Sequence, residues 1–255
     1  MKKYCLSFLC FFILILTSCN EKKLTEVVEV PLPSAAEKRI IGLPDDIVAN
    51  EGNFTLQKLP YNYDALAPHI DALTMELHYS KHYLSYTNAL NRAIIGTIFE
   101  KSTIEEILDK LNPADANFRN NAGGFYNHNL YFANMAPKAG GVPQDTLAGI
   151  IKRDFGSFET FKKQFSEEAK IQFGSAWTWL IVDKTGKLVI TSTANQDNPL
   201  MANAIVKGTP ILALDLWEHA YYINYQQNRK NYIEAFFNVV YWPKVQERYE
   251  DAVAK

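Results

Sequence analysis

The stretch that decides the fold is SAWTWLIVDKTGKLVITSTANQ, residues 175–196. Two runs rich in β-branched and aromatic residues flank Lys184-Thr185-Gly186, a polar segment that ends in the glycine favoured by tight turns. This order predicts a strand, a turn and a second strand. The apolar run TPILALDLW, residues 209–217, predicts a third strand.

The segments outside these strands have the spacing of helices. Apolar residues recur at helical intervals after Pro68, so we expect one long helix from about Pro68 to Ile95 and a second over residues 116–135. Within the second, the pair Gly123-Gly124 suggests close approach of another backbone. Further helices are expected over residues 143–157, over 157–173 with Ser157 as N-cap, and over 228–253. Helices followed by a small antiparallel sheet with helices predict an α+β fold.

The N-terminus has the pattern of a targeting segment. Lys2 and Lys3 precede an apolar run, Leu6–Leu16, which fits a secretory signal peptide and is too short for a comfortable membrane span. The run ends in Leu16-Thr17-Ser18-Cys19, which resembles a bacterial lipobox, although a plain signal peptide can also contain a cysteine. We therefore expect residues 1–18 to be a lipoprotein signal peptide and Cys19 to carry a lipid anchor. The mature protein would be exported across the inner membrane and held at the periplasmic or cell surface.

Composition limits the class of protein further. The only cysteines are Cys5, Cys10 and Cys19, so the processed chain would have no disulfide. Residues 19–53 are polar and interrupted by prolines, which predicts a tether ahead of a folded part that begins near Phe54. The formal net charge of −2 gives no indication of nucleic-acid binding.

The five histidines are the candidates for chemistry. His78 and His82 are four residues apart, so they can share a metal, or one can bind while the other supports it. His128 lies in an aromatic-rich helix, where a lone histidine is usually a hydrogen-bonded core residue. The mostly apolar LALDLWEHAYYINY, residues 212–225, carries Asp215, Glu218 and His219, and an Asp-x-x-x-His step suits either a metal or a braced loop. His69 is interpreted as structural. A site of nitrogen and oxygen ligands favours Mn, Fe or Zn.

Taken in order, several segments resemble the iron/manganese superoxide dismutase family. They are LPYNYDALAPHIDALTMELHYSKHYLSY, NNAGGFYNHNLYF, FGSAWTWLIV, TSTANQDNPLM and LDLWEHAYYINYQQNR, which together cover about residues 54–253. The resemblance implies an N-terminal helical hairpin domain, residues 54–140, and a C-terminal α/β domain with a three-stranded antiparallel sheet, residues 141–255. It also implies that a Mn or Fe ion between them converts superoxide to oxygen and hydrogen peroxide. The implied metal ligands are His78, His128, Asp215 and His219, with a solvent molecule as fifth ligand.

The resemblance assigns roles to the neighbouring residues as well. His82 is implied not to be a ligand, and Tyr86, held near the bound solvent through a glutamine, is implied to relay protons. A homodimer is implied in which Glu218 reaches the partner's His219 and His82 meets the partner's Tyr222. Three tryptophans would wall the site, and two cations would either steer the anionic substrate or be ordinary solvated charges. These residues are Trp177, Trp179, Trp217, Lys81 and Arg229.

Two positions bear on which metal is used. The iron-type pattern has Gln where this chain has Gly124, whereas the manganese type has Gly there and takes its glutamine from the segment that contains Gln196. The chain therefore resembles the manganese type, with iron as the other possibility. Tyr83 and Phe125 depart from it, because His is common at both positions. The competing interpretations are a membrane-tethered metal-binding protein without dismutase activity, and a zinc hydrolase, which is disfavoured because HYSKH lacks the glutamate of HExxH.

Overall fold

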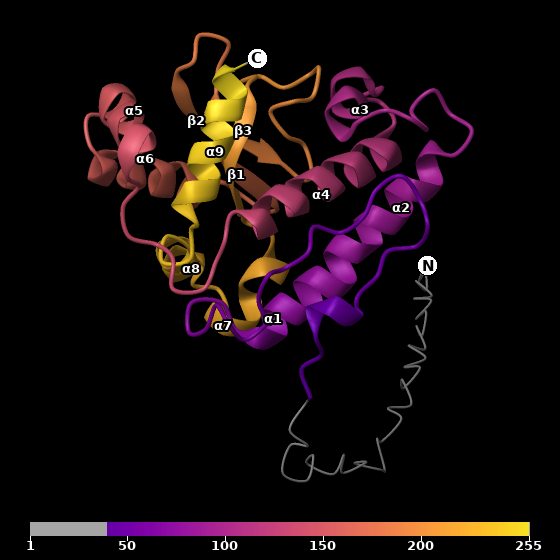
Figure 1. Cartoon of the computed structure of the whole chain (residues 1–255), viewed down its shortest axis with the longest axis horizontal. Coiled ribbons are helices and arrows are strands. Elements are labelled where there is room, and N and C mark those ends of the chain that lie inside the picture. The colour runs from indigo at the N-terminus through magenta and orange to yellow at the C-terminus, as the bar shows by residue number, and fades with distance from the viewer. Residues whose placement is uncertain (1–39, 255) are drawn as a thin grey trace, which may run out of the picture. The chain divides into compact units, whose positions relative to one another are not determined.

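The N-terminal half of the domain is a helical hairpin. The computed structural model describes residues 40–254, so the proposed signal peptide and Cys19 lie outside the described residues. Figure 1 shows the two arms of the hairpin side by side, one formed by α1, η2 and α2 and the other by α4, with the short α3 between them in the chain. The elements are α1 (Ala72–Leu77), η2 (His78–Tyr83), α2 (Leu84–Ile94), α3 (Ile104–Lys110) and α4 (Ala116–Ala133).

The first arm begins later than the sequence pattern predicts, and it is not uniform. It starts at Ala72 rather than Pro68, because the Asp71 carboxylate caps the helix by accepting from the Thr74 backbone N–H at 2.9 Å. Residues 78–83 form a π-helical segment, in which the hydrogen bonds skip one more residue than in an α-helix. This change of pitch occurs where His78 and His82 lie.

Two parts of the hairpin differ from the sequence analysis. Residues 40–53, assigned there to the tether, contact the helices: the Gly42 backbone N–H donates to the Glu76 carboxylate at 3.0 Å, and that of Asn50 donates to Asn88 at 2.7 Å. The helix α3 was not expected. Its signal was the capping box of Thr103 and Glu106, whose side chains bond each other's backbone N–H groups.

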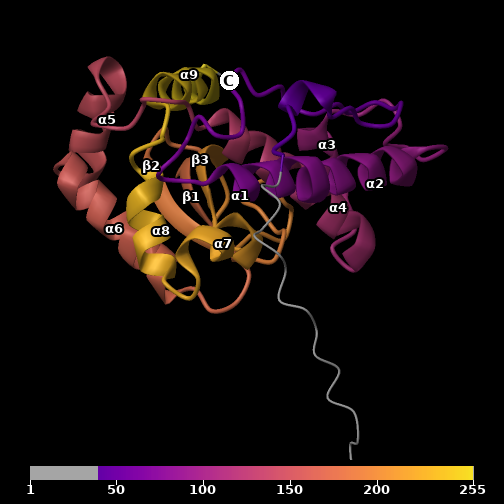
Figure 2. The same ribbon diagram turned by 90° about the horizontal axis from the view of Figure 1, so that it is seen from below.

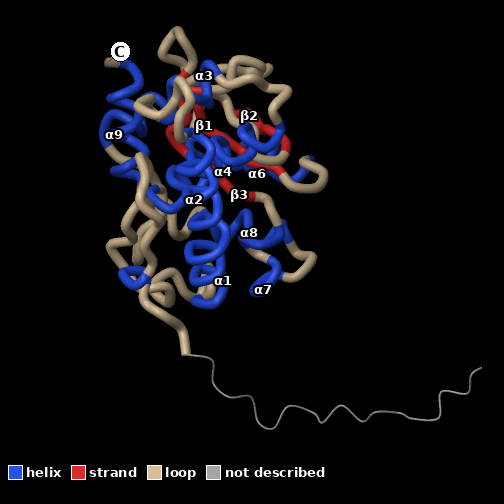
Figure 3. Tube along the Cα trace, turned by 90° about the vertical axis from the view of Figure 1, so that its right-hand side faces the viewer, coloured by secondary structure: helices blue, strands red, loops and turns tan. Residues whose placement is uncertain are grey.

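The C-terminal half is built around the expected antiparallel sheet. Figures 1 and 2 show the sheet between the hairpin and the pair α5 (Asp145–Phe155) and α6 (Phe158–Ile171), and Figure 3 shows its three strands in red. The strand order is β2-β1-β3, which confirms the predicted α+β fold. Ser157 caps α6 as predicted, by accepting from the Thr160 backbone N–H. The remaining elements are β1 (Ala176–Val182), β2 (Leu188–Ala194), β3 (Thr209–Asp215), η3 (Glu218–Ala220), α7 (Tyr222–Tyr225), α8 (Arg229–Phe236) and α9 (Trp242–Val253).

Pairing in the sheet fixes where its functional end lies. The central strand β1 is buried along its whole length. Trp177 pairs with Thr193 of β2 and with Asp215 of β3, so the end of β3 lies opposite the start of β1. No helix among residues 40–254 is long and apolar enough to cross a membrane.

Asn134, the C-cap of α4, joins the two halves. Its amide nitrogen donates to the Ile211 carbonyl at 3.1 Å, and its oxygen accepts from the Ala213 N–H at 3.2 Å. Both partners belong to β3, which is an edge strand of the sheet. Since Asn134 is fully buried, it satisfies edge groups that water cannot reach.

We expect Asn134→Ala to lower the free energy of unfolding by at least about 1–3 kcal/mol, the cost of leaving a buried polar group without its partner. Chemical denaturation of the metal-free protein measures this loss. Asn120→Ala, which changes a partly exposed asparagine of the same helix, should alter the free energy by less than about 0.5 kcal/mol. Equal values for the two variants would contradict the role given to Asn134.

Candidate metal centre

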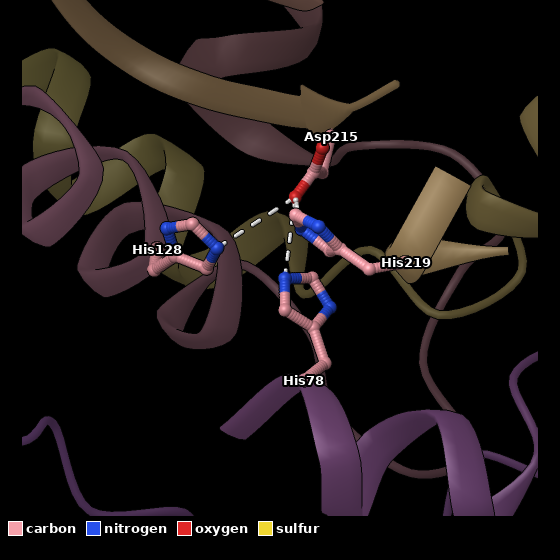
Figure 4. Close-up of side chains that lie close together, drawn as sticks. All are labelled: His78, His128, Asp215 and His219. Atoms are coloured by element: carbon pink, nitrogen blue, oxygen red, sulfur yellow. Dashed lines mark hydrogen bonds and ion pairs between the residues drawn. The ribbon is translucent and has the colours of Figure 1, made fainter. Parts of the chain in front are cut away.

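Four side chains from separate elements converge on one point between the two halves (Figure 4). Two come from the hairpin helices, one from the end of β3 and one from the short helix that follows it. One potential ligand atom of each lies within 4.8 Å of the others. We call this set the His/Asp cluster; it consists of His78, His128, Asp215 and His219.

The Asp215 carboxylate is the centre of the cluster. Its Oδ1 accepts from the Trp217 backbone N–H at 2.8 Å, which fixes the plane of the group. Its Oδ2 faces the imidazoles, with the Nε2 atoms of His219, His78 and His128 at 3.0, 3.2 and 3.9 Å in that order. One oxygen is therefore held by the protein backbone, and the other is directed at three ring nitrogens.

Burial and mutual contact set the charges of the cluster. Burial alone would raise the pKa of Asp215, but the imidazoles of His219 and His78 hold it well below its usual range. Burial lowers the pKa of His78 to about 4 and that of His128 well below the usual value for histidine. At neutral pH the carboxylate is thus ionised and these imidazoles are neutral, which are the forms that bind a metal cation.

Hydrogen bonding leaves ring nitrogens without partners. The His128 Nδ1 lies 2.6 Å from the Gly124 carbonyl and donates to it, so its lone pair is on Nε2. That Nε2 and the His78 Nδ1 are buried without a hydrogen-bond partner, and the His78 Nε2 faces only the Asp215 Oδ2. Buried polar atoms without partners are rare, and a cation would complete their coordination. Ligands on opposite sides of an ion at bond lengths of about 2.0–2.2 Å lie about 4.0–4.4 Å apart, close to the spread of this cluster.

Hydrogen bonds around Gln196 reach the edge of the cluster at Tyr86. The Gln196 Nε2 donates to the Tyr86 hydroxyl at 3.3 Å, and the Tyr86 ring lies 5.2 Å from that of His128. The Gln196 Oε1 accepts from the Trp177 indole at 3.1 Å and from the Asn127 amide at 3.1 Å. Burial raises the pKa of Tyr86, so its hydroxyl keeps its proton at neutral pH.

The expected close approach at Gly123-Gly124 is present. A Cβ on Gly123 would lie 2.0 Å from the Gln196 backbone oxygen, and one on Gly124 would lie 2.5 Å from the Tyr86 ring. Neither position has space for a side chain. The glycines therefore allow Gln196 and Tyr86 to meet on the surface of α4.

The other proposed site residues lie around the cluster. His82 is outside it, and its ring stacks on that of His219 with 4.0 Å between centroids. Glu218 is exposed, and Tyr222 is 47% exposed. Lys81 is also exposed, whereas the Arg229 guanidinium donates to the backbone carbonyls of Gln172 and Gly174.

The aromatic residues divide into those that touch the cluster and those behind it. The Trp177 ring lies 5.3 Å from that of His128, and Trp217 stacks on His219 at 5.6 Å. Trp179 stacks on Trp177. Among residues 40–254 it makes no ring contact with an imidazole of the cluster, so it supports Trp177 from behind. Tyr83 is fully buried, and its ring lies parallel to that of His128 at 6.1 Å. Its hydroxyl accepts from the Gln57 N–H at 2.9 Å, away from the cluster.

Sequence reasoning missed two residues of this network, Asn127 and Asn198. Both are fully buried, and the Asn198 amide donates to the Asn127 oxygen at 3.0 Å. The available signal was position: Asn127 immediately precedes His128, and Asn198 follows Gln196 by two residues. Asn127 is one of five asparagines in α4, and asparagine is common in loops such as the one that holds Asn198, so position alone did not distinguish them.

Comparison with known proteins supports an assignment for the whole domain. Residues 53–136 match the model described as the alpha-hairpin domain of iron/manganese superoxide dismutases, and residues 143–248 match that for the C-terminal domain. A protein of Methylomonas sp. (strain J) named superoxide dismutase [Mn/Fe] is 48% identical over 79% of this chain and all of its own length. One from Pseudomonas aeruginosa named superoxide dismutase [Mn] is 47% identical over 78% of this chain and 98% of its own.

We expect Gly124→Ala to destabilise the protein by about 1–3 kcal/mol, because the added methyl group overlaps the Tyr86 ring. Gly149→Ala is the matched control, since a Cβ there meets no atom within 4 Å. Because Gly149 lies inside α5, the control should raise stability by about 0.5–1 kcal/mol. Denaturant titration of both variants measures these changes, and a neutral Gly124→Ala would show that the ring can move aside.

Proposed function

The chain belongs to the iron/manganese superoxide dismutase family, and we propose that it is a manganese-type enzyme whose ion is held by the His/Asp cluster. The observation that carries this proposal is the convergence of three imidazole Nε2 atoms on one oxygen of a buried, ionised carboxylate, with the His128 Nε2 left without a hydrogen-bond partner. When bound, the ion supplies the one-electron chemistry that oxidises one superoxide to oxygen and reduces a second to hydrogen peroxide. A donor set of three neutral imidazoles and one carboxylate leaves net positive charge on such an ion, which favours an anionic substrate.

The protein's part in this reaction is to hold and deliver protons. Reduction of superoxide to hydrogen peroxide consumes two protons, and the Tyr86 hydroxyl carries one beside the His128 ring. The Gln196 N–H donates to the Tyr86 oxygen, so it orients the hydroxyl and stabilises the phenolate after the proton leaves. Trp177 and Trp217 limit the access of water to the cluster from two sides.

The source of the glutamine favours manganese over iron. The Tyr86 ring occupies the space next to Gly124, so a glutamine at that position would displace it. The amide instead comes from Gln196, after β2, and is held by Trp177 and Asn127. A group that bonds near a metal tunes its affinity and potential, so the element that supplies it influences which ion works. Iron remains the second candidate ion.

We expect Gln196→Ala to reduce turnover by about 10–100-fold per bound manganese while the metal content stays unchanged. Tyr86→Phe keeps Gln196 and removes only the hydroxyl, so it should slow mainly the proton-dependent step. Pulse-radiolysis kinetics with parallel elemental analysis measure both effects. Gln144→Ala, at an exposed glutamine before α5, is the control. Full activity of Gln196→Ala per bound manganese would remove the main support for the manganese assignment.

We also infer that two copies of the chain pair through the face that carries His82, Glu218 and Tyr222. All three are at least partly exposed, and the His82 ring stacks on the cluster residue His219. An exposed carboxylate next to that histidine suits a bond to the partner's His219, as the family resemblance implies. Pairing would thus connect the two metal sites through charged contacts.

Loss of one member of a buried charged contact costs about 3–5 kcal/mol, so Glu218→Ala should weaken the dimer by more than about 100-fold and loosen the metal. Sedimentation velocity over a range of concentrations, with metal analysis, tests this. Glu234→Ala removes an exposed glutamate of α8 and should change neither quantity. A Glu218→Ala protein with the sedimentation profile and metal content of the wild type would refute the contact.

We propose, finally, that the enzyme is tethered by lipid at Cys19 on the periplasmic or cell surface. The support is the lipobox-like Leu16-Thr17-Ser18-Cys19 after an apolar run.

Cys19→Ala should move the protein from the detergent phase to the aqueous phase in detergent phase partitioning, because no acylated cysteine remains. Cys10→Ala changes a cysteine of the same segment and should leave the protein in the detergent phase. If the wild-type protein partitions into the aqueous phase and its mature N-terminus is not Cys19, the proposed lipid anchor is wrong.

A further inference from the structure

Every amide around Gln196 has a fixed direction. Asn198 lies in the loop after Gln196, and its Oδ1 accepts from the Leu200 backbone N–H at 3.1 Å. A backbone N–H can only donate, so the Asn198 oxygen must face Leu200 and its NH₂ must face the other way. That NH₂ donates to the Asn127 Oδ1 at 3.0 Å.

The direction is passed on at Asn127. Since its oxygen is taken by Asn198, its NH₂ faces Gln196, donating to the backbone oxygen at 3.0 Å and to Oε1 at 3.1 Å. Both N–H groups of Asn127 are used. The Gln196 Oε1, which also accepts from the Trp177 indole at 3.1 Å, is thereby turned away from Tyr86, and the Gln196 Nε2 is turned toward it. If any of these amides were reversed, two donors or two acceptors would face each other and a hydrogen bond would be lost.

The loop that carries these residues is itself held in place. Arg119 of α4 pairs with Asp197 at 3.1 Å, and the Trp217 indole donates to the Asn195 carbonyl at 3.0 Å. Asn195 adopts φ 54°, a left-handed conformation that asparagine tolerates well. With the loop held at Asn195 and Asp197, loss of the Asn198 side chain would act mainly through the amides rather than through displacement of the loop.

We propose that Asn198 is a positioning residue for the dismutase reaction, which acts through Asn127 to fix the direction of the Gln196 amide. Asn198, Asn127 and Gln196 are each at most 1% exposed, so no water competes for these bonds. The inference rests on the proposed function, in which Gln196 tunes the bound ion. It adds Asn198 to the residues that control the ion, although the loop that holds Asn198 supplies no ligand.

The test compares the midpoint potential of the manganese-loaded protein across variants. We expect Asn198→Ala to shift the potential in the same direction as Gln196→Ala but by less, and to lower turnover by about twofold to tenfold, the effect of one hydrogen bond. Asn198→Leu keeps the branching of the side chain and is somewhat larger, so it leaves no cavity. It should give the same shift in potential, which separates loss of the amide from creation of a cavity. Asn134→Ala is the matched control: it removes another fully buried asparagine and should reduce stability with no shift in potential.

The double variant Asn198→Ala/Gln196→Ala decides the route. If Asn198 acts through the Gln196 amide, the double variant has the potential of Gln196→Ala alone, although its stability falls further. Additive shifts would overturn the proposal, as would single Asn198 variants whose potentials match the wild type. If Gln196→Ala itself leaves the potential unchanged, Gln196 does not tune the bound ion as the proposed function requires. The positioning role of Asn198 then fails as well.

Discussion

A carboxylate that is fully buried and ionised destabilises a fold unless its charge is met, and Asp215 is such a group. Its two oxygens are met differently: one by a backbone N–H two residues on, the other by three imidazoles. The imidazoles come from both arms of the hairpin and from the turn after β3. The cluster therefore requires the hairpin and the sheet domain to pack together.

The contacts around the cluster are almost entirely aromatic or amide. Tryptophan and tyrosine rings fill the space next to the imidazoles. The tryptophan indole N–H can only donate a hydrogen bond, and burial keeps the Tyr86 hydroxyl protonated. Buried amides have a defined donor end and acceptor end, so they can transmit direction without carrying charge. This combination keeps Asp215 as the negative charge of the His/Asp cluster while the position of a proton at Tyr86 is still controlled.

Two glycines make this arrangement possible. On α4, Gly123 and Gly124 are followed by Asn127 and His128, so one helix provides both the flat surface and the polar groups. The π-helical segment at His78–Tyr83 has a comparable role on the other arm. It places His78 in the cluster while His82 stacks on His219 at its edge. The local departure from regular α-helix in the first arm thus occurs where side chains must reach the site.

The sequence alone determined the class of fold, the three strands and the identity of the His/Asp cluster, because these depend on residue type, on period and on a resemblance spread over nearly the whole domain. It also indicated the close approach at the paired glycines, since only glycine leaves such space. It did not determine the start of α1, the π-helical pitch or the packing of residues 40–53, which depend on caps and on contacts with distant helices. Nor did it reveal the amide chain, because Asn127 and Gln196 are 69 residues apart, and Gln196 and Tyr86 are 110 apart. The direction of an amide is set by which donors and acceptors surround it, and only the tertiary structure brings those groups together.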